Sequence, residues 1–421
     1  MYLTAVDLGS SHIKGVVAEV KKGGSLVVTK TFKKKSRGIK RGEIIHPDET
    51  VKALFESLSD VKRFDRRALR NLVFGISGTK SRFHVSRAAV SIPRPDHEIL
   101  PEDVERVIKE SLAVSLPAGW EVVHSFPREF IIDDIEVDNA NVVGLSGRKL
   151  GANVILISLF SSVYKNFLKV ARLVLGKKSE FDGSLFFSPL ACERAVLTKN
   201  QKELGVVLVD IGFGTTSVVA FQEEKMLAMR VFPVGAGNIT NDLAVGLKCS
   251  IETAESVKRK YGSASARSVS VKDKIDISQI EEGQGTAVSR KFVAEIIEAR
   301  VREIFGLIHQ ELVSIEKGGQ FPAGVVLTGG GAQLAGVLDV AREELRLPVH
   351  IGIARSHEFE VSHSHIEEEL SDPEMTVACG LVLSKIDMLG KGSEFGLSSR
   401  GAYNLNESRF KKFIKTLLAL D

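Results

Sequence analysis

Cysteine is scarce in this chain of 421 residues. Its three cysteines, Cys192, Cys249 and Cys379, lie far apart and show no CxxC spacing, which argues against both a disulfide framework and a zinc site. No apolar run approaches the roughly 20 residues that a membrane-spanning helix needs. The N-terminus also lacks the basic and apolar regions of a signal peptide. These absences predict a protein of the reducing cytosol with no segment that crosses a membrane.

Net charge is small as well. The chain has 57 Lys and Arg against 53 Asp and Glu, a formal +4, which gives no global reason to expect a nucleic-acid partner. Residues 21–41 hold nine basic and no acidic side chains, but Phe32 is their only aromatic neighbour. We therefore interpret this stretch as an exposed hairpin, not as a nucleic-acid surface. The apolar fraction of 43% over this length predicts a globular protein with two or more cores.

Two common nucleotide motifs, GxxxxGK[ST] and GxGxxG, are missing, which excludes P-loop and dinucleotide-binding proteins. An internal repeat is present instead. The segment DLGSSHIKGVVAEV from Asp7 recurs from Asp210 as DIGFGTTSVVAFQEE. Each copy follows a β-branched run and is typical of a strand, a glycine turn and a second strand. The repeat predicts a two-lobed α/β protein built from a duplicated unit, whose two turns face each other.

Both turns carry groups that bind a phosphate and its magnesium ion. A phosphate needs unhindered backbone N–H groups and hydroxyls, and magnesium needs carboxylates. One Asp-Gly turn alone is usually a plain hairpin, but two copies half a chain apart favour a ligand site. The candidates are Asp7, Gly9, Ser10, Ser11 and Lys14 in the first turn, and Asp210, Gly212, Gly214, Thr215 and Thr216 in the second.

A third glycine cluster, Gly329, Gly330 and Gly331, follows a buried-type strand and precedes a helix expected to begin near Gln333. A base or sugar can lie against a backbone that has no side chains. A tight strand-to-helix turn is the alternative explanation for such a triplet. Apolar spacing also predicts helices over 47–58, 102–112 and 291–315.

Five ordered segments resemble the signature of the actin and Hsp70 ATPase superfamily: DLGSS near the N-terminus, SPLACERAVL (188–197), VVLVDIGFGTT (206–216), VVLTGGGAQ (325–333) and TVACGLVL (376–383). Four more are similar to the FtsA family of bacterial cell-division proteins: SRGIKRGEI (36–44), GISGTKSRF (75–83), NVVGLSGRKL (141–150) and VGAGNITNDLAVGL (234–247). The resemblance covers nearly the whole chain. It implies an α/β, two-lobed actin-like ATPase fold with a duplicated core and an FtsA-type inserted subdomain.

The resemblance also implies a division into segments. The first-lobe core spans 1–83 and returns at 164–195, around an inserted subdomain at 84–163. The second-lobe core spans 196–228 and returns at 313–384, around an insertion at 229–312. A flexible linker is expected at 385–405 and a C-terminal amphipathic membrane helix at 406–421.

The ligand that the resemblance implies is ATP between the lobes, with Mg²⁺ held through water by Asp7 and Asp210. Gly235, Gly237 and Asn238 match the family's GxGN next to the nucleotide. Glu255 and Lys258 are three residues apart on one helix face and are expected at the ribose, with a helix-surface pair as the alternative. The glycine cluster, together with Gln333, completes the expected nucleotide site.

The sequence departs from the family pattern at three positions. FtsA sequences often have Lys where His12 stands and a third glycine where Phe213 stands. Hydrolysing relatives usually have Glu or Gln directly before the proline that matches Pro189, and this chain has Ser188. Because a hydroxyl is not an effective general base, we predict slow or absent ATP turnover.

The tail from Ser408, SRFKKFIKTLLALD, has an apolar stripe at helical spacing opposite a cluster of cations. A terminal core helix is the usual explanation of such a stripe. A Gly/Ser-rich linker before it and the crowded cations favour a helix on anionic lipid. The expected membrane residues are Arg409, Phe410, Lys411, Lys412, Phe413, Ile414, Lys415, Leu417 and Leu418.

The family resemblance implies head-to-tail polymers through the inserted subdomain and binding of the C-terminal peptide of the tubulin-like FtsZ by the second-lobe insertion. Arg300, Arg302 and Glu303 are the expected peptide contacts, with core packing of their helix as the alternative. Other divisome proteins are further expected partners, at the septum on the cytoplasmic face of the inner membrane. No nucleic-acid partner is expected.

Two other functions stay open at this point. A pilus-assembly relative of the PilM type shares the fold but is expected to act through a membrane-protein partner without a lipid-binding helix. A sugar or acyl kinase of the superfamily needs a further carboxylate between the lobes. His357, His363 and His365 are interpreted as a solvated loop, with a metal site as the alternative.

Overall fold

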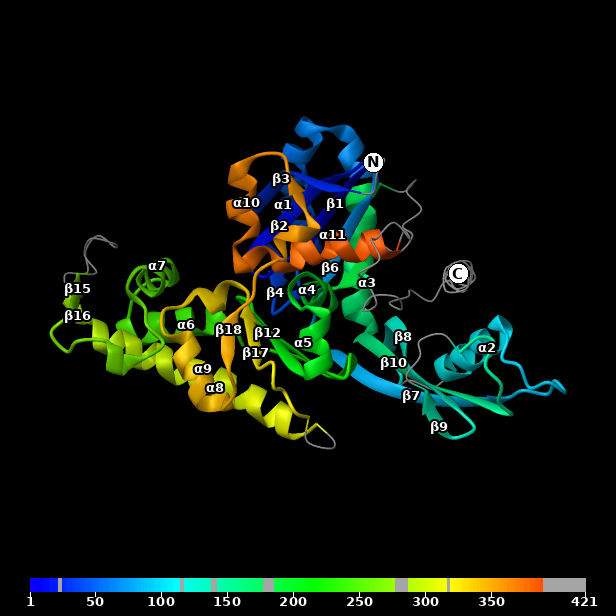
Figure 1. Cartoon of the computed structure of the whole chain (residues 1–421). Helices are drawn as coiled ribbons and strands as arrows, with labels where there is room; N and C mark the ends of the chain where they lie inside the picture. The colour runs from blue at the N-terminus through cyan, green and yellow to red at the C-terminus, as the bar shows by residue number, and fades with distance from the viewer. Residues whose placement is uncertain are drawn as a thin grey trace.

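The computed structural model describes residues 1–21, 25–113, 117–137, 142–176, 185–276, 287–315 and 319–388. These residues form two lobes, each built on a mixed sheet, and a smaller sheet that projects from the first lobe (Figure 1). The expected tail helix at 406–421 lies outside them. So does the expected linker at 385–405, except for its first four residues, which end α11 (Thr376–Met388).

The first lobe contains a six-stranded sheet in the order β11-β6-β1-β2-β3-β19. Its strands are β1 (Tyr2–Leu8), β2 (His12–Val20), β3 (Leu26–Lys35), β6 (Leu72–Ile76), β11 (Leu185–Phe187) and β19 (Glu360–Val361). Consecutive residues of β1 from Leu3 to Leu8 are buried, and they do not alternate with exposed ones. This pattern requires cover on both faces of the sheet.

Helices supply that cover. α11 packs against β1, β2 and β6, and α1 packs against β2 and β3. α1 begins with Pro47 and two acidic residues and ends with Lys62 and Arg63, the charge order that the helix dipole favours. The helices of this lobe are α1 (Pro47–Phe64), α3 (Ser161–Leu175), α4 (Ser188–Val196), α10 (Ser364–Leu370) and α11, and a short hairpin joins β4 (Ile39–Lys40) to β5 (Glu43–Ile44).

The second lobe contains a five-stranded sheet in the order β14-β13-β12-β17-β18. Its strands are β12 (Val206–Ile211), β13 (Thr216–Gln222), β14 (Lys225–Phe232), β17 (Val325–Thr328) and β18 (Val349–Ile351). The other elements are α5 (Lys199–Leu204), α6 (Ala236–Leu247), α7 (Ile251–Tyr261), β15 (Lys274–Asp276), β16 (Ala287–Ser289), α8 (Arg290–Val313) and α9 (Val337–Leu345). The apolar stripe predicted over 291–315 is buried along α8.

The two large sheets share one topology. The order β3-β2-β1-β6-β11 in the first lobe corresponds to β14-β13-β12-β17-β18 in the second, with the same parallel and antiparallel pairings. Both predicted Asp-Gly turns join an antiparallel pair, β1 to β2 and β12 to β13. The predicted duplicated α/β core is therefore confirmed.

The smaller sheet is antiparallel, in the order β7-β10-β8-β9, and α2 packs on one of its faces. Its elements are β7 (Ser81–Ser91), α2 (Pro101–Leu112), β8 (Trp120–Ile132), β9 (Ile135–Val137) and β10 (Lys149–Phe160). The backbone N–H of Phe160 donates to the carbonyl of Lys80 at 3.1 Å. The chain therefore enters and leaves this subdomain at one place.

The inserted subdomain also contacts the second lobe. Lys225, at the start of β14, forms an ion pair with Glu129 of β8 at 3.2 Å and another with Glu136 of β9. These contacts fix the subdomain against the second sheet.

In the first lobe α4 crosses α11, and α4 also contacts β12 and β13 of the second lobe. A Cβ atom at Gly380 would lie 1.7 Å from the carbonyl oxygen of Ala191, so the two helix backbones touch without a side chain between them. No other residue fits at Gly380 without separating the helices.

Three expectations from the sequence are wrong in detail. The basic stretch 21–41 is not simply an exposed hairpin, because β3 lies inside the first sheet and buries Val28 and Phe32. The glycine cluster leads into a 3-10 turn (Gly330–Gln333), and the following helix, α9, begins only at Val337. Within 313–384, assigned to the second lobe, β19, α10 and α11 pack with the first sheet.

Candidate nucleotide-binding site

A cavity of about 510 Å³ lies between the lobes, a size typical of a small-molecule site. Both Asp-Gly turns, the glycine cluster and helix α7 contribute to its wall. Of the predicted residues, those that line it are Asp7, Gly9, Ser10, Ser11, Lys14, Asp210, Gly212, Gly214, Thr215, Glu255, Lys258, Gly329, Gly330, Gly331 and Gln333. Residues predicted from segments more than 200 positions apart thus meet at one site.

The first turn aims a lysine at a carboxylate. Asp7 and Lys14 face each other in the β1–β2 register, and Lys14 Nζ lies 3.1 Å from Asp7 Oδ2. Burial opposes the charge of Lys14, but Asp7 and Glu374 raise its pKa above the usual value. Lys14 therefore stays protonated, as a phosphate ligand must.

The carboxylate of the second turn, Asp210, has less nearby positive charge to offset the cost of its burial. Burial, with a smaller contribution from nearby Asp7, raises the pKa of Asp210 to about 6, although Lys14 opposes this. Two carboxylates that share one close lysine fit a divalent cation. Among the described residues, no cluster of three His, Cys, Asp or Glu side chains forms a ready metal cage. A magnesium ion that keeps its waters and takes phosphate oxygens fits this donor set.

Gly329 brings the glycine cluster close to Asp210. Its φ is +81°, and a Cβ atom there would lie 2.2 Å from Asp210 Oδ1. Only glycine combines this left-handed conformation with so close an approach. The bare backbone of Gly329 to Gly331 therefore forms one wall of the cavity.

Glu255 and Lys258 form an ion pair in which Lys258 is buried and Glu255 is partly exposed at the cavity wall. Lys258 Nζ lies 2.6 Å from Glu255 Oε2 and donates to Thr240 Oγ1 at 2.7 Å and to the carbonyl of Ala236 at 3.1 Å. Burial lowers the pKa of Lys258, against the raising effect of Glu255. The pair is rigidly placed at the cavity wall, where a ribose hydroxyl can reach it.

Four predicted residues do not line the cavity: Thr216, Gly235, Gly237 and Asn238. They shape the start of α6 instead. Thr216 Oγ1 donates to the carbonyl of Val234 at 2.9 Å, and Asn238 Oδ1 accepts from the N–H of Gly235 at 3.1 Å. These four residues therefore support the second turn and the start of α6 and are not part of the cavity wall.

Comparison with known proteins decides the family. Residues 207–380 match the family model described as cell division protein FtsA, and residues 78–158 match the SHS2 domain inserted in FtsA. FtsA of Bacillus subtilis is 32% identical over 354 residues, which cover 82% of this chain and 77% of that protein. The chain belongs to the FtsA family of cell-division proteins. FtsA of Pseudomonas aeruginosa is 29% identical over 407 residues, covering 97% and 94% of the two chains.

Solved structures show the same fold. The PilM–PilN type IV pilus biogenesis complex matches with a TM-score of 0.62 and 18% identity, covering 90% of this chain and 97% of that one. Spiroplasma citri MreB5 bound to ADP matches with a TM-score of 0.53 and 14% identity, covering 93% and 97%. The predicted actin-like fold with an FtsA-type inserted domain is thus confirmed, and the role is that of an actin-like cell-division protein.

Two departures from the FtsA pattern have a structural explanation. The Phe213 ring packs on the start of α6, where a Cβ atom at Gly237 would lie 2.7 Å from it, and Lys258 Nζ lies 5.7 Å from the ring centroid. The ring is thus accommodated beside the turn. His12 Nδ1 lies 2.9 Å from Ser11 Oγ, and burial and then Lys33 lower the pKa of His12. A neutral imidazole therefore stands where FtsA relatives often have a cation.

The third departure, Ser188, lines the cavity at the first turn of α4. It is 8% exposed, and its Oγ would lie 2.8 Å from a Cβ atom at Gly75. No carboxylate or amide side chain stands at this position to orient a water molecule.

The cavity contains charged residues that the sequence did not single out: Lys33, Arg259, Lys260, Arg290 and Glu374. Lys33 of β3 lies directly opposite Lys14 of β2. Glu374 precedes α11 and pairs with Lys33. The alternation of side chains along β3 indicates on which face of the sheet Lys33 lies. No local sequence signal, however, predicts that the turn after residue 370 contacts β3.

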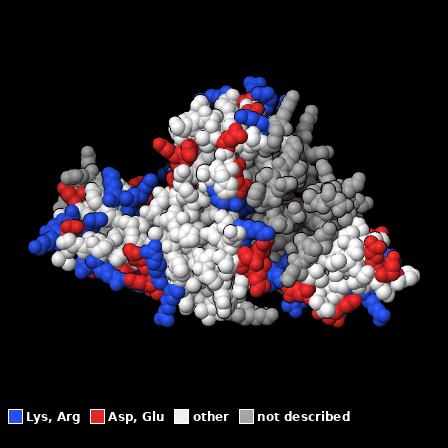
Figure 2. Space-filling model, in the orientation of Figure 1, with Lys and Arg blue, Asp and Glu red and all other residues white. Residues whose placement is uncertain are grey.

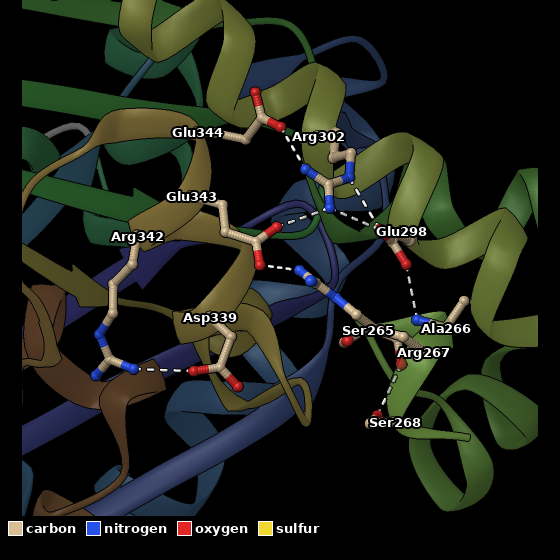
Figure 3. Close-up of polar contacts among 10 residues, drawn as sticks. All are labelled: Ser265, Ala266, Arg267, Ser268, Glu298, Arg302, Asp339, Arg342, Glu343 and Glu344. Carbon is tan, nitrogen blue, oxygen red and sulfur yellow. Dashed lines mark hydrogen bonds and ion pairs between the residues drawn. The ribbon is translucent and has the colours of Figure 1, made fainter. Parts of the chain in front are cut away.

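The predicted partner residues lie on α8, away from the cavity. Figure 3 shows Arg302 between Glu298 of its own helix and Glu343 and Glu344 of α9, with N–O distances of 2.8, 2.9 and 2.5 Å. The other two predicted contacts, Arg300 and Glu303, pair with each other. Arg300 also pairs with Asp242 of α6 at 2.7 Å. All three side chains thus have intramolecular partners.

The predicted membrane residues 409–418 lie outside the described residues. None of the described helices is both long and apolar enough to span a membrane. On the face shown in Figure 2, acidic and basic side chains are interspersed over the described part of the chain. Of the three histidines weighed as a metal site, His363 and His365 stack at 5.7 Å, and no metal cluster forms among the described residues.

Proposed function

We propose that this FtsA-family protein binds ATP with Mg²⁺ between its lobes, polymerises head to tail, and tethers FtsZ filaments to the cytoplasmic membrane. The supporting observation for the nucleotide is the meeting of both Asp-Gly turns and the glycine cluster at one cavity. This is the arrangement that a nucleotide with its cation requires.

Each group has a role in this proposal. Lys14 and the hydroxyls of Ser10, Ser11 and Thr215 hold phosphate oxygens from the two sides of the cleft. Asp7 and Asp210 hold the waters of Mg²⁺, which neutralises phosphate charge when bound.

The nucleoside lies toward the other end of the cleft. Its ribose lies by Glu255 and Lys258, and its base lies against the backbone of Gly330.

The nucleotide is a structural and switching ligand, and its turnover is slow, because Ser188 supplies no general base. Glu374 is a further carboxylate in the cavity, the feature that a kinase of this fold needs. Burial raises its pKa, but the hydrogen bond from Lys33 and the charge of Lys14 lower it below the usual value. As long as Glu374 stays paired with Lys33 it is a poor base, and this arrangement does not favour the kinase alternative.

Membrane attachment rests on the tail, residues 406–421, which follow a linker. Each Phe or Leu buried at the interface contributes at most ~1.5 to 3 kcal/mol, and each cation about 1 kcal/mol near anionic lipid. One such helix must also be ordered, so a single copy binds weakly and reversibly. A polymer that presents many copies binds by avidity.

The remaining interactions are assigned to the two insertions. The inserted subdomain, about 84–163, forms the polymer contact, and the second-lobe insertion, about 229–312, binds the FtsZ C-terminal peptide near Arg300, Arg302 and Glu303. The protein then acts at the septum, on the cytoplasmic face of the inner membrane, where it recruits other divisome proteins. A PilM-type role shares the fold but does not require the tail.

Calorimetric titration of the purified full chain with ATP and Mg²⁺ tests the nucleotide site. Asp210→Asn is expected to weaken binding at least tenfold in magnesium and much less in its absence. Absence of ATP binding by the unaltered chain would refute this part of the proposal.

Co-sedimentation with vesicles of anionic lipid tests the tether. The full chain is expected in the pellet, and a chain that ends at residue 406 in the supernatant. Retained binding by the shortened chain would sink the tail assignment, and loss of binding in high salt would support it.

A further inference from the structure

The segment Asp372 to Glu374 lies between α10 and α11 of the first lobe and contacts the second lobe. The carbonyl of Pro373 accepts from the N–H of Gly329 at 3.2 Å and from Thr328 Oγ1 at 3.1 Å. Both donors belong to the end of β17 and the glycine cluster. The segment is therefore held by the second sheet at the point where the cavity begins.

Glu374 extends from this segment to the first sheet. Its carboxylate accepts from Lys33 Nζ at 2.5 Å, and its backbone carbonyl accepts from Lys14 Nζ at 2.7 Å. The two lysines are direct neighbours in the β2–β3 register. Glu374 thus engages two adjacent cations of the first sheet, next to a residue that is bonded to the second lobe.

The side chains of this contact lie in the cleft and not in a core. Lys33 is 38% exposed and Glu374 24%, and both line the cavity. An ion pair with this much solvent contributes little to stability and is easily exchanged for another anion. A phosphate, with three strong acceptor oxygens and more charge than one carboxylate, is such an anion.

The charged residues around Lys33 and Glu374 indicate that Lys33 exchanges Glu374 for another anion only when a phosphate is bound. Lys14 already faces Asp7, and His12 beside it has a lowered pKa and is neutral at pH 7. At this end of the cleft, Lys14 is paired with Asp7 of the first Asp-Gly turn. Lys33 is paired instead with Glu374, which belongs to neither turn. Phosphates bound at Lys14 would lie beside the carboxylate of Glu374 and repel it.

We propose that Lys33 is a further phosphate-binding residue, held by Glu374 in the empty site and released to the nucleotide when it binds. The proposal rests on nucleotide binding in this cleft. The expected ligand class is a nucleoside di- or triphosphate, because its terminal phosphates carry the charge that competes with the carboxylate of Glu374. Release of Glu374 removes its side-chain contact with β3, so that the segment 372–374, which also contacts Gly329 and Thr328 of the second lobe, is held less tightly when phosphates are bound.

Binding of ATP, ADP and AMP to the full chain, in magnesium and by calorimetry, tests this. Glu374→Gln keeps the shape and removes the competing charge, and is expected to bind ATP and ADP at least fivefold more tightly, with little change for AMP. Lys33→Met is expected to weaken ATP and ADP at least fivefold. With Lys33→Met in place, Glu374→Gln is expected to have less effect, since the two residues act on one contact.

Asp60→Asn is the matched control. It removes the carboxylate that pairs with Lys34 at 3.1 Å, one residue along the same strand and outside the cavity. It is expected to leave all three affinities unchanged. Hydrogen exchange gives a second readout: ATP is expected to speed exchange in the peptide 372–376 of the unaltered chain, whereas Glu374→Gln shows fast exchange with or without ATP.

The outcomes separate the two proposals. If the unaltered chain binds none of the nucleotides, both the nucleotide site and this inference fail. If it binds ATP and Glu374→Gln, folded with an unchanged unfolding temperature, binds ATP no more tightly, this inference alone fails. Unchanged ATP affinity in Lys33→Met would overturn it independently.

Discussion

His124 of β8 accepts a hydrogen bond from the backbone N–H of Phe187 through Nε2, at 2.9 Å. Phe187 immediately precedes Ser188, which lines the cavity. The imidazole is 1% exposed and packs on Phe186 with ring centroids 4.8 Å apart. Burial lowers the pKa of His124 to about 3. The neutral imidazole of His124 thus links the sheet of the inserted subdomain to Phe187, the residue directly before the cavity-lining Ser188.

This contact predicts a pH-dependent stability. The folded pKa of His124 lies below the unfolded value of 6.5, so the unfolded chain binds the extra proton between about pH 6.5 and pH 3. The free energy of unfolding should therefore fall as the pH drops below 6.5, by up to about 1.4 kcal/mol per unit from this residue, or roughly 2 kcal/mol at pH 5. Urea unfolding at pH 7.5 and 5.0 measures it. His124→Gln cannot titrate, so its loss should be about 2 kcal/mol smaller, and equal losses would refute the assignment.

A second prediction concerns the crossing of α4 and α11. Gly380→Ala places a methyl group against the carbonyl of Ala191 and should cost about 3 kcal/mol or more, because the helices must separate. Gly306→Ala is the control, since a Cβ atom at this position within α8 meets nothing within 4 Å. It should stabilise the protein by up to about 1 kcal/mol. Thermal unfolding of the two variants checks both signs, and a tolerated Gly380→Ala would contradict the described packing.

A third prediction concerns ATP turnover. The unaltered chain is expected to hydrolyse ATP slowly, and Ser188→Glu or Ser188→Gln to raise the steady-state rate by about tenfold or more, since a positioned base contributes ~10² or more. Phosphate release at saturating ATP and Mg²⁺ measures this, with ATP affinity determined in parallel. A rate in the unaltered chain equal to that of an active kinase would show that Ser188 does not limit the chemistry.

A fourth prediction concerns the contribution of Arg302, on α8, to the stability of the second lobe. Arg302 joins Glu298 to Glu343 and Glu344, so Arg302→Ala should destabilise the second lobe by about 1 kcal/mol, after allowance for its partial exposure. Arg267 contacts Glu343 at a more exposed position, and Arg267→Ala should cost less than about 0.5 kcal/mol. Chemical unfolding at low and high salt measures both. Equal effects of the two substitutions would contradict the central place of Arg302 in Figure 3.

The sequence predicted those parts of the cavity in which one short motif contains both the residues that form the turn and the side chain that can bind a ligand. Asp7 and Asp210 are the second-last residues of their strands, two positions before a glycine, so the motif places the carboxylate and the turn together. Gly235 and Asn238 carry the same kind of motif but are used to start α6, because a cap and a ligand contact need the same residue types.

Lys33 and Glu374 could not be predicted in the same way. They are 341 positions apart, and each is unremarkable in its own segment: a lysine in a basic strand and a glutamate after Asp-Pro. Their contact exists only because the chain returns to the first sheet through β19, α10 and α11. The same return explains why 313–384 did not divide as the sequence suggested.

The hydrogen bond between Phe160 and Lys80 closes the two ends of the inserted subdomain at a single point of the first lobe. A unit whose two ends meet adds one covalent junction to its host, whatever its length, and its other contacts include the His124–Phe187 hydrogen bond and the ion pairs of Lys225. In evolutionary terms such a unit can be acquired, lost or replaced while the nucleotide cleft stays intact. Changes within the subdomain can then arise without a break in the strands that carry the two Asp-Gly turns.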